Sequence, residues 1–141
     1  MNAADLKIVA LFADFGDDDR EAVAELLEAR ELAKGRRVFS EGEEADALLL
    51  VLEGRVRLEG ADGSVEGAMV AGDAMGGLAL VRMGKRAATA VCEEPCRLAW
   101  LDRSGYRRLA DDYPRTACRL MEAILAAFAA DVREALDDAE L

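Results

Sequence analysis

Residues 48–59, Leu-Leu-Leu-Val-Leu-Glu-Gly-Arg-Val-Arg-Leu-Glu, decide the fold class of this chain. An apolar run of strand length ends at Glu53-Gly54, where glycine accepts the positive φ of a tight turn without steric cost. After the turn, Val56 and Leu58 alternate with charged residues, which is the period-two pattern of a strand with one wet face. The stretch therefore predicts two strands joined by a tight turn.

The same texture extends on both sides of this pair, from residue 37 to residue 102. Short apolar or β-branched runs are separated by glycine and acidic turns, such as Ala61-Asp62-Gly63. The predicted strands are 37–40, 48–53, 55–59, 64–70, 87–91 and 97–102. The segment is expected to form a small antiparallel β-roll or barrel.

Helices are predicted before and after the roll. Residues 3–12 form a short helix, and Asp18 with Glu21 makes a capping-box-like start for a second helix that runs to about Ala33. After the last strand, residues 104–111 form a short helix, and Pro114 sits in the first turn of a long one that reaches almost to the C-terminus. We therefore expect one domain, residues 1–141, with a helical lead-in (1–35), a β-roll (36–102) and C-terminal helices (103–141).

The long C-terminal helix carries an apolar stripe that is wider than one packing partner needs. Its members are Ala117, Leu120, Met121, Ile124, Leu125, Phe128, Val132 and Leu136. One side is expected to pack on the roll and the other on a second copy of the helix, which gives a symmetric homodimer. A helix that lies wholly on its own domain is the alternative.

Composition and charge argue against several classes of protein. The 141 residues, 52% of them hydrophobic, suffice for one core but not for two ordinary domains. A net charge of -11 repels nucleic-acid phosphate and anionic membranes, so neither is an expected partner. No apolar run approaches the roughly 20 residues of a membrane span, and the N-terminus lacks a signal pattern, so we expect a cytoplasmic protein.

Catalytic and metal-binding chemistry find little support in the residue types. The chain has no histidine, and its cysteines form no CxxC pair, so neither a zinc site nor the usual triads can be assembled. We therefore expect no enzyme activity, no catalytic residue, no metal and no resident cofactor. The side chains interpreted as reduced structural thiols or core packing are Cys92, Cys96, Cys118, Trp100, Met69, Met75 and Met83.

The segment most informative about function is residues 72–89, Gly-Asp-Ala-Met-Gly-Gly-Leu-Ala-Leu-Val-Arg-Met-Gly-Lys-Arg-Ala-Ala-Thr. A glycine-rich turn leads into a short apolar helix, an arrangement that can cradle a phosphate with backbone N–H groups. Arg86 then supplies a counter-charge, because its rigid fork of donors suits two phosphate oxygens better than an ammonium does. Such turns and lone arginines are also common in small β proteins, so the residue types alone leave a purely structural role open.

With its flanks, this segment resembles the cyclic-nucleotide-binding domain family, which is found in catabolite-activator-type regulators, cyclic-nucleotide-dependent kinases and gated channels. The resemblance includes residues 38–43, Val-Phe-Ser-Glu-Gly-Glu, residues 48–56 and the long helix after the roll. The family's phosphate-binding cassette reads roughly Phe-Gly-Glu-Leu-Ala-Leu and, after several residues, Pro-Arg-Ser/Thr/Ala-Ala-Thr. This chain has Met-Gly-Gly-Leu-Ala-Leu at 75–80 and Lys-Arg-Ala-Ala-Thr at 85–89, and we call residues 72–89 the cassette.

The resemblance implies a β-roll of the jelly-roll type and a set of ligand-binding residues. Arg86 would hold a cyclic phosphate, supported by the backbone at Gly76, Gly77, Leu78, Ala79, Ala87 and Ala88. Ala87 replaces the hydroxyl residue linked in the family with cGMP preference, so cAMP is the expected ligand. Gly77 stands where the family has the glutamate that grips the ribose 2′-hydroxyl. Losing a charge-assisted hydrogen bond of this kind costs roughly 1.5–3 kcal/mol, or about ten- to a hundredfold in affinity.

Two functions follow as hypotheses. The first is a regulatory or sensory module in which cAMP or another anionic nucleotide binds the cassette and repositions the C-terminal helix by a population shift. We expect no room for a helix-turn-helix domain after that helix, so output would pass to an unknown downstream protein or through dimer geometry. The alternative is a degenerate member that keeps the fold as a protein-interaction or dimerisation scaffold without nucleotide, with Gly77 as its main support.

Overall fold

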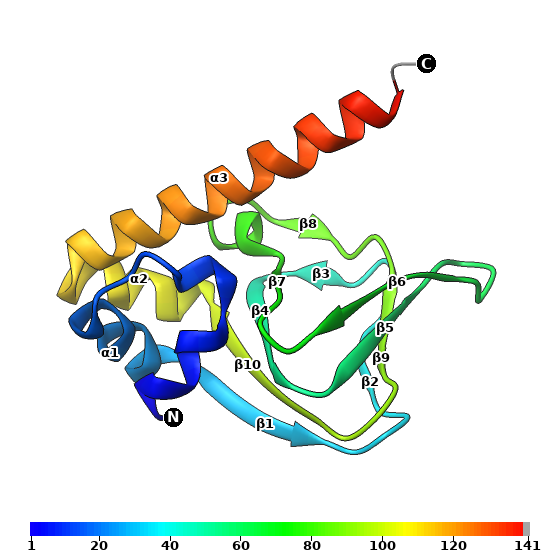
Figure 1. The fold of residues 1–141 in the computed structure, drawn as a ribbon, viewed down its shortest axis with the longest axis horizontal. Helices are drawn as coiled ribbons and strands as arrows, with labels where there is room; N and C mark the ends of the chain where they lie inside the picture. Colours follow the sequence, from blue (N-terminus) through cyan, green and yellow to red (C-terminus); the bar gives the residue numbers. More distant parts are fainter. Residues whose placement is uncertain (140–141) are drawn as a thin grey trace.

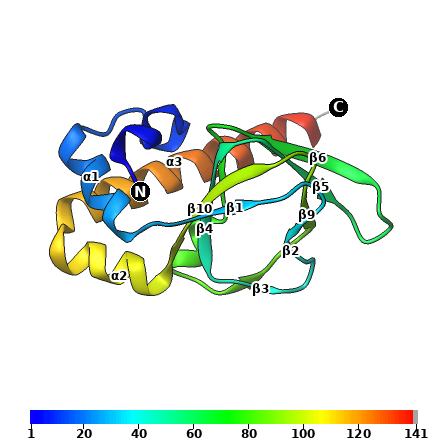
Figure 2. The ribbon, with the colours of Figure 1, turned by 90° about the horizontal axis from the view of Figure 1, so that it is seen from below.

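The computed structural model describes residues 1–139 as a β-roll with helices gathered at one end (Figure 1). A view from below shows the roll and the helical end next to each other, with the long C-terminal helix passing along both (Figure 2). All strand pairs are antiparallel, as expected from the predicted roll. The predicted fold class, an antiparallel roll with flanking helices and a long C-terminal helix, is confirmed.

Two four-stranded sheets and one two-stranded ribbon make up the roll. The first sheet has the order β1 (Glu28–Leu32), β10 (Cys96–Asp102), β4 (Ala47–Glu53) and β7 (Ala74–Met75). The second has the order β2 (Arg37–Phe39), β9 (Thr89–Cys92), β5 (Arg55–Glu59) and β6 (Val65–Val70). The ribbon joins β3 (Glu44–Ala45) to β8 (Gly84–Lys85). All six predicted strands are present with small shifts at their ends, the largest being that the strand predicted from residue 87 begins at Thr89.

The helical elements fall into an N-terminal group, one short helix in the cassette and a C-terminal pair. They are η1 (Ala3–Ile8), η2 (Ala10–Phe12), α1 (Asp17–Leu26), η3 (Gly77–Leu80), α2 (Arg103–Asp112) and α3 (Pro114–Ala139). The helix predicted over residues 3–12 is present as two short 3-10 helices, and the two C-terminal helices are confirmed. No helix within residues 1–139 is long and apolar enough to cross a membrane.

The prediction of a helix that runs to Ala33 is wrong. The helix α1 starts after Gly16, which is its N-cap in place of the predicted Asp18 region, and it ends at Leu26. Residues 28–32, although rich in good helix formers, form β1 and pair with β10 in the register Glu28↔Trp100. The edge of β10 offers a ladder of backbone hydrogen bonds there, and such tertiary pairing overrides a weak local propensity.

The strand β4 is buried on both faces and divides the core into two clusters. Leu48, Leu50 and Leu52 face the helices, whereas Leu49 and Val51 face the inside of the roll. Each of these side chains is at most 3% exposed. Because both faces are covered, the strand is a continuous apolar run and shows no alternation of polar and apolar residues.

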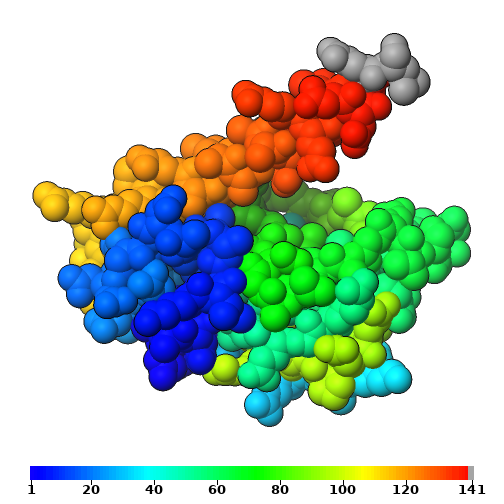
Figure 3. Space-filling model, in the orientation of Figure 1, coloured from blue at the N-terminus to red at the C-terminus, as the bar shows by residue number. Residues whose placement is uncertain are grey.

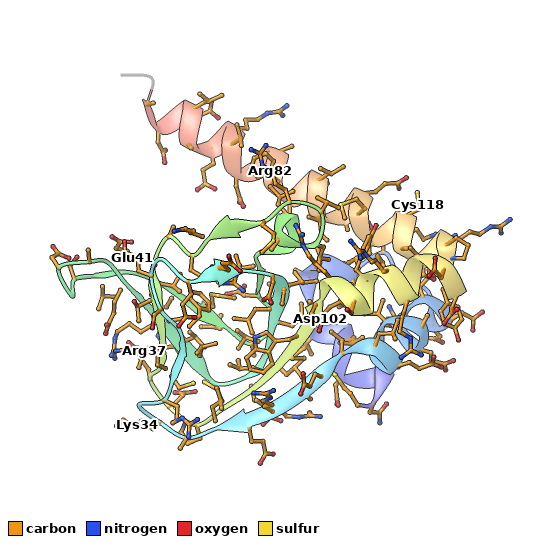
Figure 4. All side chains as sticks on the ribbon, turned by 180° about the vertical axis from the view of Figure 1, so that it is seen from behind. Lys34, Arg37, Glu41, Arg82, Asp102 and Cys118 are labelled. Atoms are coloured by element: carbon orange, nitrogen blue, oxygen red, sulfur yellow. The ribbon has the colours of Figure 1, made fainter. Side chains whose placement is uncertain are left out.

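Several side chains interpreted as core packing are buried, but two are not. Cys92, Cys96 and Met69 are buried, and Met75 and Trp100 are half-buried. By contrast, Met83 lies exposed in the loop between η3 and β8, and Cys118 lies exposed on the outer face of α3 (Figure 4). The interpretation as core residues is therefore wrong for Met83 and Cys118, since sequence type alone does not tell which face of a helix or loop is covered.

Only the first half of α3 packs on the domain. Ala117, Leu120 and Ile124 are buried at helical spacing, and every described residue after Ile124 is exposed. Figure 3 shows the red, C-terminal part of the helix projecting away from the roll. The apolar stripe predicted from the sequence is thus split between a buried part and an exposed part.

A buried carboxylate ties α3 to α1. Asp19 is 6% exposed and accepts a hydrogen bond from the Thr116 hydroxyl at 2.6 Å and another from the Arg119 guanidinium. Burial alone would raise the pKa of Asp19, but the hydrogen bonds from Thr116 and Arg119 and the Arg119 charge lower it by more, so the net direction is downward. These hydrogen bonds fix the position of the first turns of α3 relative to α1.

Asp19→Asn should destabilise the protein in a pH-dependent way. Loss of the charge-assisted bonds should lower the free energy of unfolding by about 1.5–3 kcal/mol at pH 7. A carboxyl whose pKa is lower in the folded state stabilises the fold above its unfolded pKa, about 3.9, and loses that contribution as pH falls through the folded pKa. The difference in free energy of unfolding between wild type and Asp19→Asn, measured by urea unfolding, should therefore be constant above about pH 5 and shrink below about pH 4.

The neighbouring exposed carboxylate gives the control, since Asp18→Asn removes the same charge and should leave stability almost unchanged. A difference between Asp19→Asn and wild type that does not depend on pH would contradict this account of the clamp.

Candidate functional site

The cassette runs along the side of the roll that faces α3. It contains the turn at Gly72, the short strand β7, the helix η3, the exposed loop 81–83, the strand β8 and then Arg86. The predicted short apolar helix after the glycines is therefore confirmed, as a 3-10 helix. Arg86 lies between β8 and β9, three residues before β9 starts at Thr89.

Arg86 lies inside the roll and is almost completely covered. Its guanidinium sits over the ring of Phe39, 4.5 Å from the ring centroid, and Nη2 donates a hydrogen bond to the Ala47 carbonyl oxygen at 3.2 Å. Only 9% of the residue is exposed. Within residues 1–139 its side chain forms no ion pair and donates no other hydrogen bond. A guanidinium has five N–H donors, so most of this donor set is free for another acceptor.

The charge of Arg86 persists despite its burial. Burial lowers the pKa of the guanidinium, and the negative charges of Asp46 and Glu43 oppose that shift. Arginine remains protonated under such conditions, because its unperturbed pKa is above 12. No fully buried side-chain nitrogen in the described part of the chain lacks a partner, so the free guanidinium nitrogens still reach solvent. The site is a nearly buried cation that an anion can approach.

Gly76 brings the backbone of the cassette against this cation. Its φ is +78°, in the left-handed region that favours glycine. A Cβ at this position would lie 2.6 Å from Nη1 of Arg86 and 2.9 Å from the Ala47 carbonyl oxygen. Any side chain would therefore strain the backbone and displace the guanidinium, which explains why the first glycine of the pair is needed.

Backbone and side-chain hydrogen bonds hold the cassette at two places, Arg86 and Ala79. The Arg86 N–H donates to the Glu43 carbonyl at 2.8 Å, and the Gly42 N–H donates to the Arg86 carbonyl at 2.9 Å. The Arg103 guanidinium, at the start of α2, donates to the Ala79 carbonyl at 2.8 Å. These contacts fix the segment at η3 and at Arg86, so Arg86 is held in place by its own main chain as well as by its side chain.

A recess of about 210 Å³ opens between the cassette and α3. Residues 74–78 form its cassette wall, and Ile124, Ala127 and Phe128 form the wall on α3. Asp131, farther along α3, supplies the charged group in its lining. The recess is smaller than the roughly 300–1,000 Å³ of typical small-molecule sites, so a nucleotide would need α3 or the cassette to move in order to enter it.

The structure brings together only part of the predicted site. Gly76, Gly77 and Leu78 line the recess. Arg86 is not among the lining residues, and it is connected to the recess through Gly76, which lies against its guanidinium. Ala79 is buried, and its backbone N–H already donates to the Gly76 carbonyl at 3.0 Å, so in this arrangement it is not free to donate to a ligand. Neither of the predicted residues that follow Arg86 lines the recess, and of these Ala87 is exposed and Ala88 half-buried.

Sequence reasoning missed four contributors to this region. Phe39 and Ala47 surround the Arg86 guanidinium, and Ile124 and Asp131 reach the recess from α3. Phe39 lay within a motif used only for the fold, and Ile124 lay within the apolar stripe. Nothing in the sequence pattern singled out Asp131 or the Ala47 carbonyl. Each reaches the cassette only because the fold brings distant segments of the chain together.

Comparisons with known proteins agree with this geometry. A family profile described as the cyclic nucleotide-binding domain matches residues 29–113. The cAMP-dependent protein kinase regulatory subunit of Yarrowia lipolytica is 30% identical over 105 residues, which are 74% of this chain and 28% of that protein.

Two solved structures share the fold. The catabolite activator protein of Thermus thermophilus matches with a TM-score of 0.74 and 27% identity over 90% of this chain and 61% of its own. The regulatory domain of Toxoplasma gondii PKA, crystallised with cAMP, matches with a TM-score of 0.70 and 25% identity over 92% of this chain and 48% of its own. The chain thus spans less than two thirds of the length of each of these three proteins.

The profile covers more than half of the chain, and the overall fold agrees with a solved member. We conclude that this protein belongs to the cyclic nucleotide-binding domain family, whose domains are regulatory and not catalytic.

Proposed function

We propose that this domain is a sensor that binds an anionic nucleotide, cAMP in preference to cGMP, at the cassette and signals through α3. The observation that carries the proposal is Arg86, a cation that is nine-tenths buried and has no ion pair within residues 1–139. A buried charge without a partner is costly, so an anion that pairs with it is strongly favoured. The cAMP in the related Toxoplasma gondii regulatory domain supports this choice of ligand.

The signalling route rests on the position of α3. Gly76 touches the Arg86 guanidinium, and its neighbour Gly77 touches Ile124 of α3, so two adjacent residues join the anion site to the helix. A ligand that enlarges the small recess would favour an arrangement in which α3 lies farther from the cassette. We propose that this population shift is the output, read by a downstream protein or by a second copy of the chain. A cytoplasmic location remains a prediction from the sequence.

A scaffold that binds no nucleotide is the second candidate, and Gly77 favours it. The residue that grips the ribose 2′-hydroxyl in the family is missing, and the space is filled by α3. Under this alternative Arg86 is a structural residue that holds Phe39 and Ala47 together. The two candidates differ in whether added nucleotide stabilises the protein.

Thermal unfolding with cAMP, cGMP and cyclic dinucleotides tests the sensor. A ligand at one hundred times its Kd adds about 2.7 kcal/mol to the folded state by mass action. For a domain of this size that raises Tm by roughly 5–10 °C. We expect this rise with cAMP, a smaller one with cGMP, and none in Arg86→Ala.

The matched control is Arg82→Ala, which removes the same charge from an exposed position in the same segment and should keep the response (Figure 4). A wild-type protein whose Tm does not move at millimolar nucleotide would rule out the sensor and leave the scaffold.

We further propose that the exposed half of the α3 stripe pairs with a second copy of the helix. Leu125, Phe128, Val132 and Leu136 are each between 40% and 63% exposed. Four large apolar side chains at helical spacing on a helix that stands clear of its own domain match the seam of a helix pair. The proposed homodimer is symmetric about this seam.

Phe128→Glu should convert the dimer to a monomer, because a charge in an apolar helix seam is costly. Analytical ultracentrifugation measures the change. Ala130 lies about 200° around the helix from Phe128, so Ala130→Glu adds the same charge on the opposite face and should leave the dimer intact. A wild-type protein that sediments as a monomer at micromolar concentration would refute the pairing.

A further inference from the structure

Residue 77 faces α3 at a distance that leaves no room for a side chain. A Cβ built on Gly77 would lie 2.7 Å from Cγ2, 2.9 Å from Cγ1 and 3.1 Å from Cδ1 of Ile124. Carbon atoms pack best about 3.5–4.0 Å apart, so even alanine would overlap this side chain. Unlike Gly76, Gly77 does not have a positive φ, so the constraint at this position is space and not backbone conformation.

Ile124 cannot easily move out of the way. It is 4% exposed and belongs to the core cluster that also holds Leu120 and Ala117, which lie one and two turns earlier on the same face of α3. Its β-branched side chain has one strongly preferred χ1 rotamer in a helix. Without a ligand to offset the cost, a shift of the whole helix is unfavourable, because it would uncover Leu120 and pull against the hydrogen bonds to Asp19.

Within residues 1–139, no carboxylate lines the recess beside Gly77, where the side chain of Ile124 lies. Asp131 is the charged residue of the lining, and it lies seven residues beyond Ile124. With a rise of 1.5 Å per residue, the two positions are about 10 Å apart along the helix. The wall beside Gly77 is therefore apolar, formed by Leu78, Ile124 and Ala127.

We infer that residue 77 is a packing position for α3, and that the cassette holds its nucleotide by the phosphate without reading the ribose 2′-hydroxyl. The inference rests on the proposed function and names its ligand class more closely. The accepted ligands are cyclic nucleotides with or without a free 2′-hydroxyl, because the polar partner for that group has been exchanged for the contact with Ile124. Gly77 and Ile124 thus determine specificity together, because Gly77 offers no polar group and Ile124 fills the space beside it.

The direct test compares Kd for cAMP and for 2′-deoxy-cAMP by calorimetric titration of the whole chain. We expect the two values to agree within about threefold, whereas a charge-assisted hydrogen bond to the hydroxyl would separate them by roughly tenfold or more. A tenfold preference for cAMP would overturn the inference while leaving the sensor in place. If Asp131→Asn then abolished that preference, Asp131 would be the group that reads the ribose. Failure of both ligands to bind would overturn the sensor, and the ligand class with it.

The packing role can be tested without any ligand, by a double-mutant cycle on thermal unfolding. Gly77→Ala should lower Tm by roughly 3–10 °C, because it overpacks the contact. In Gly77→Ala/Ile124→Ala the loss should be clearly smaller than the sum of the two single losses, since truncation of Ile124 makes room for the new methyl group.

Gly84→Ala is the matched control, because Gly84 lies in the same segment, has no positive φ and has no atom within 4 Å of an added Cβ. It should change Tm little. A Gly77→Ala variant as stable as Gly84→Ala, or a strictly additive double variant, would overturn the assignment of residue 77 to packing.

Discussion

The cassette passes through a gap that has no space for a side chain at two successive residues. On one side Gly76 lies against the guanidinium of Arg86, and on the other Gly77 lies against Ile124. Three other elements supply the groups that surround these two glycines. The strand β4 provides the Ala47 carbonyl that receives Arg86, β2 provides the Phe39 ring below it, and the first half of α3 provides the isoleucine above.

Each side of this gap is fixed by contacts that are distant in sequence. The Arg86 backbone is hydrogen-bonded to the loop at residues 42–43. The Ala79 carbonyl of η3 accepts a hydrogen bond from Arg103 at the start of α2. The start of α3 is bonded through Thr116 and Arg119 to Asp19 of α1. Under the proposed function, a displacement at the cassette would be passed to α3 through these neighbours, and the exposed second half of α3 would report it.

The fold was predictable from local patterns, because the glycine turns at residues 54 and 63 and the apolar runs between them repeat the period of strands. The strand β1 was not predictable in this way, since Glu-Ala-Arg-Glu-Leu has the composition of a helix and becomes a strand only by pairing with β10. The residue types alone did not decide the role of Arg86, because glycine-rich turns and lone arginines are common in small β proteins; the resemblance to the family singled it out. The contact between Gly77 and Ile124 was not predictable, because it joins residues 47 positions apart and depends on where α3 crosses the cassette.

The central claim is that binding of an anion at Arg86 changes the surroundings of Ile124 through Gly76 and Gly77. The chain has two isoleucines, Ile8 and Ile124, so a methyl NMR spectrum of the labelled protein reports this contact with an internal reference. The account predicts that saturating cAMP shifts the Ile124 methyl signal and leaves that of Ile8, which is 53% exposed, almost in place. Saturable binding of cAMP with an unmoved Ile124 signal would contradict the link between the cassette and α3.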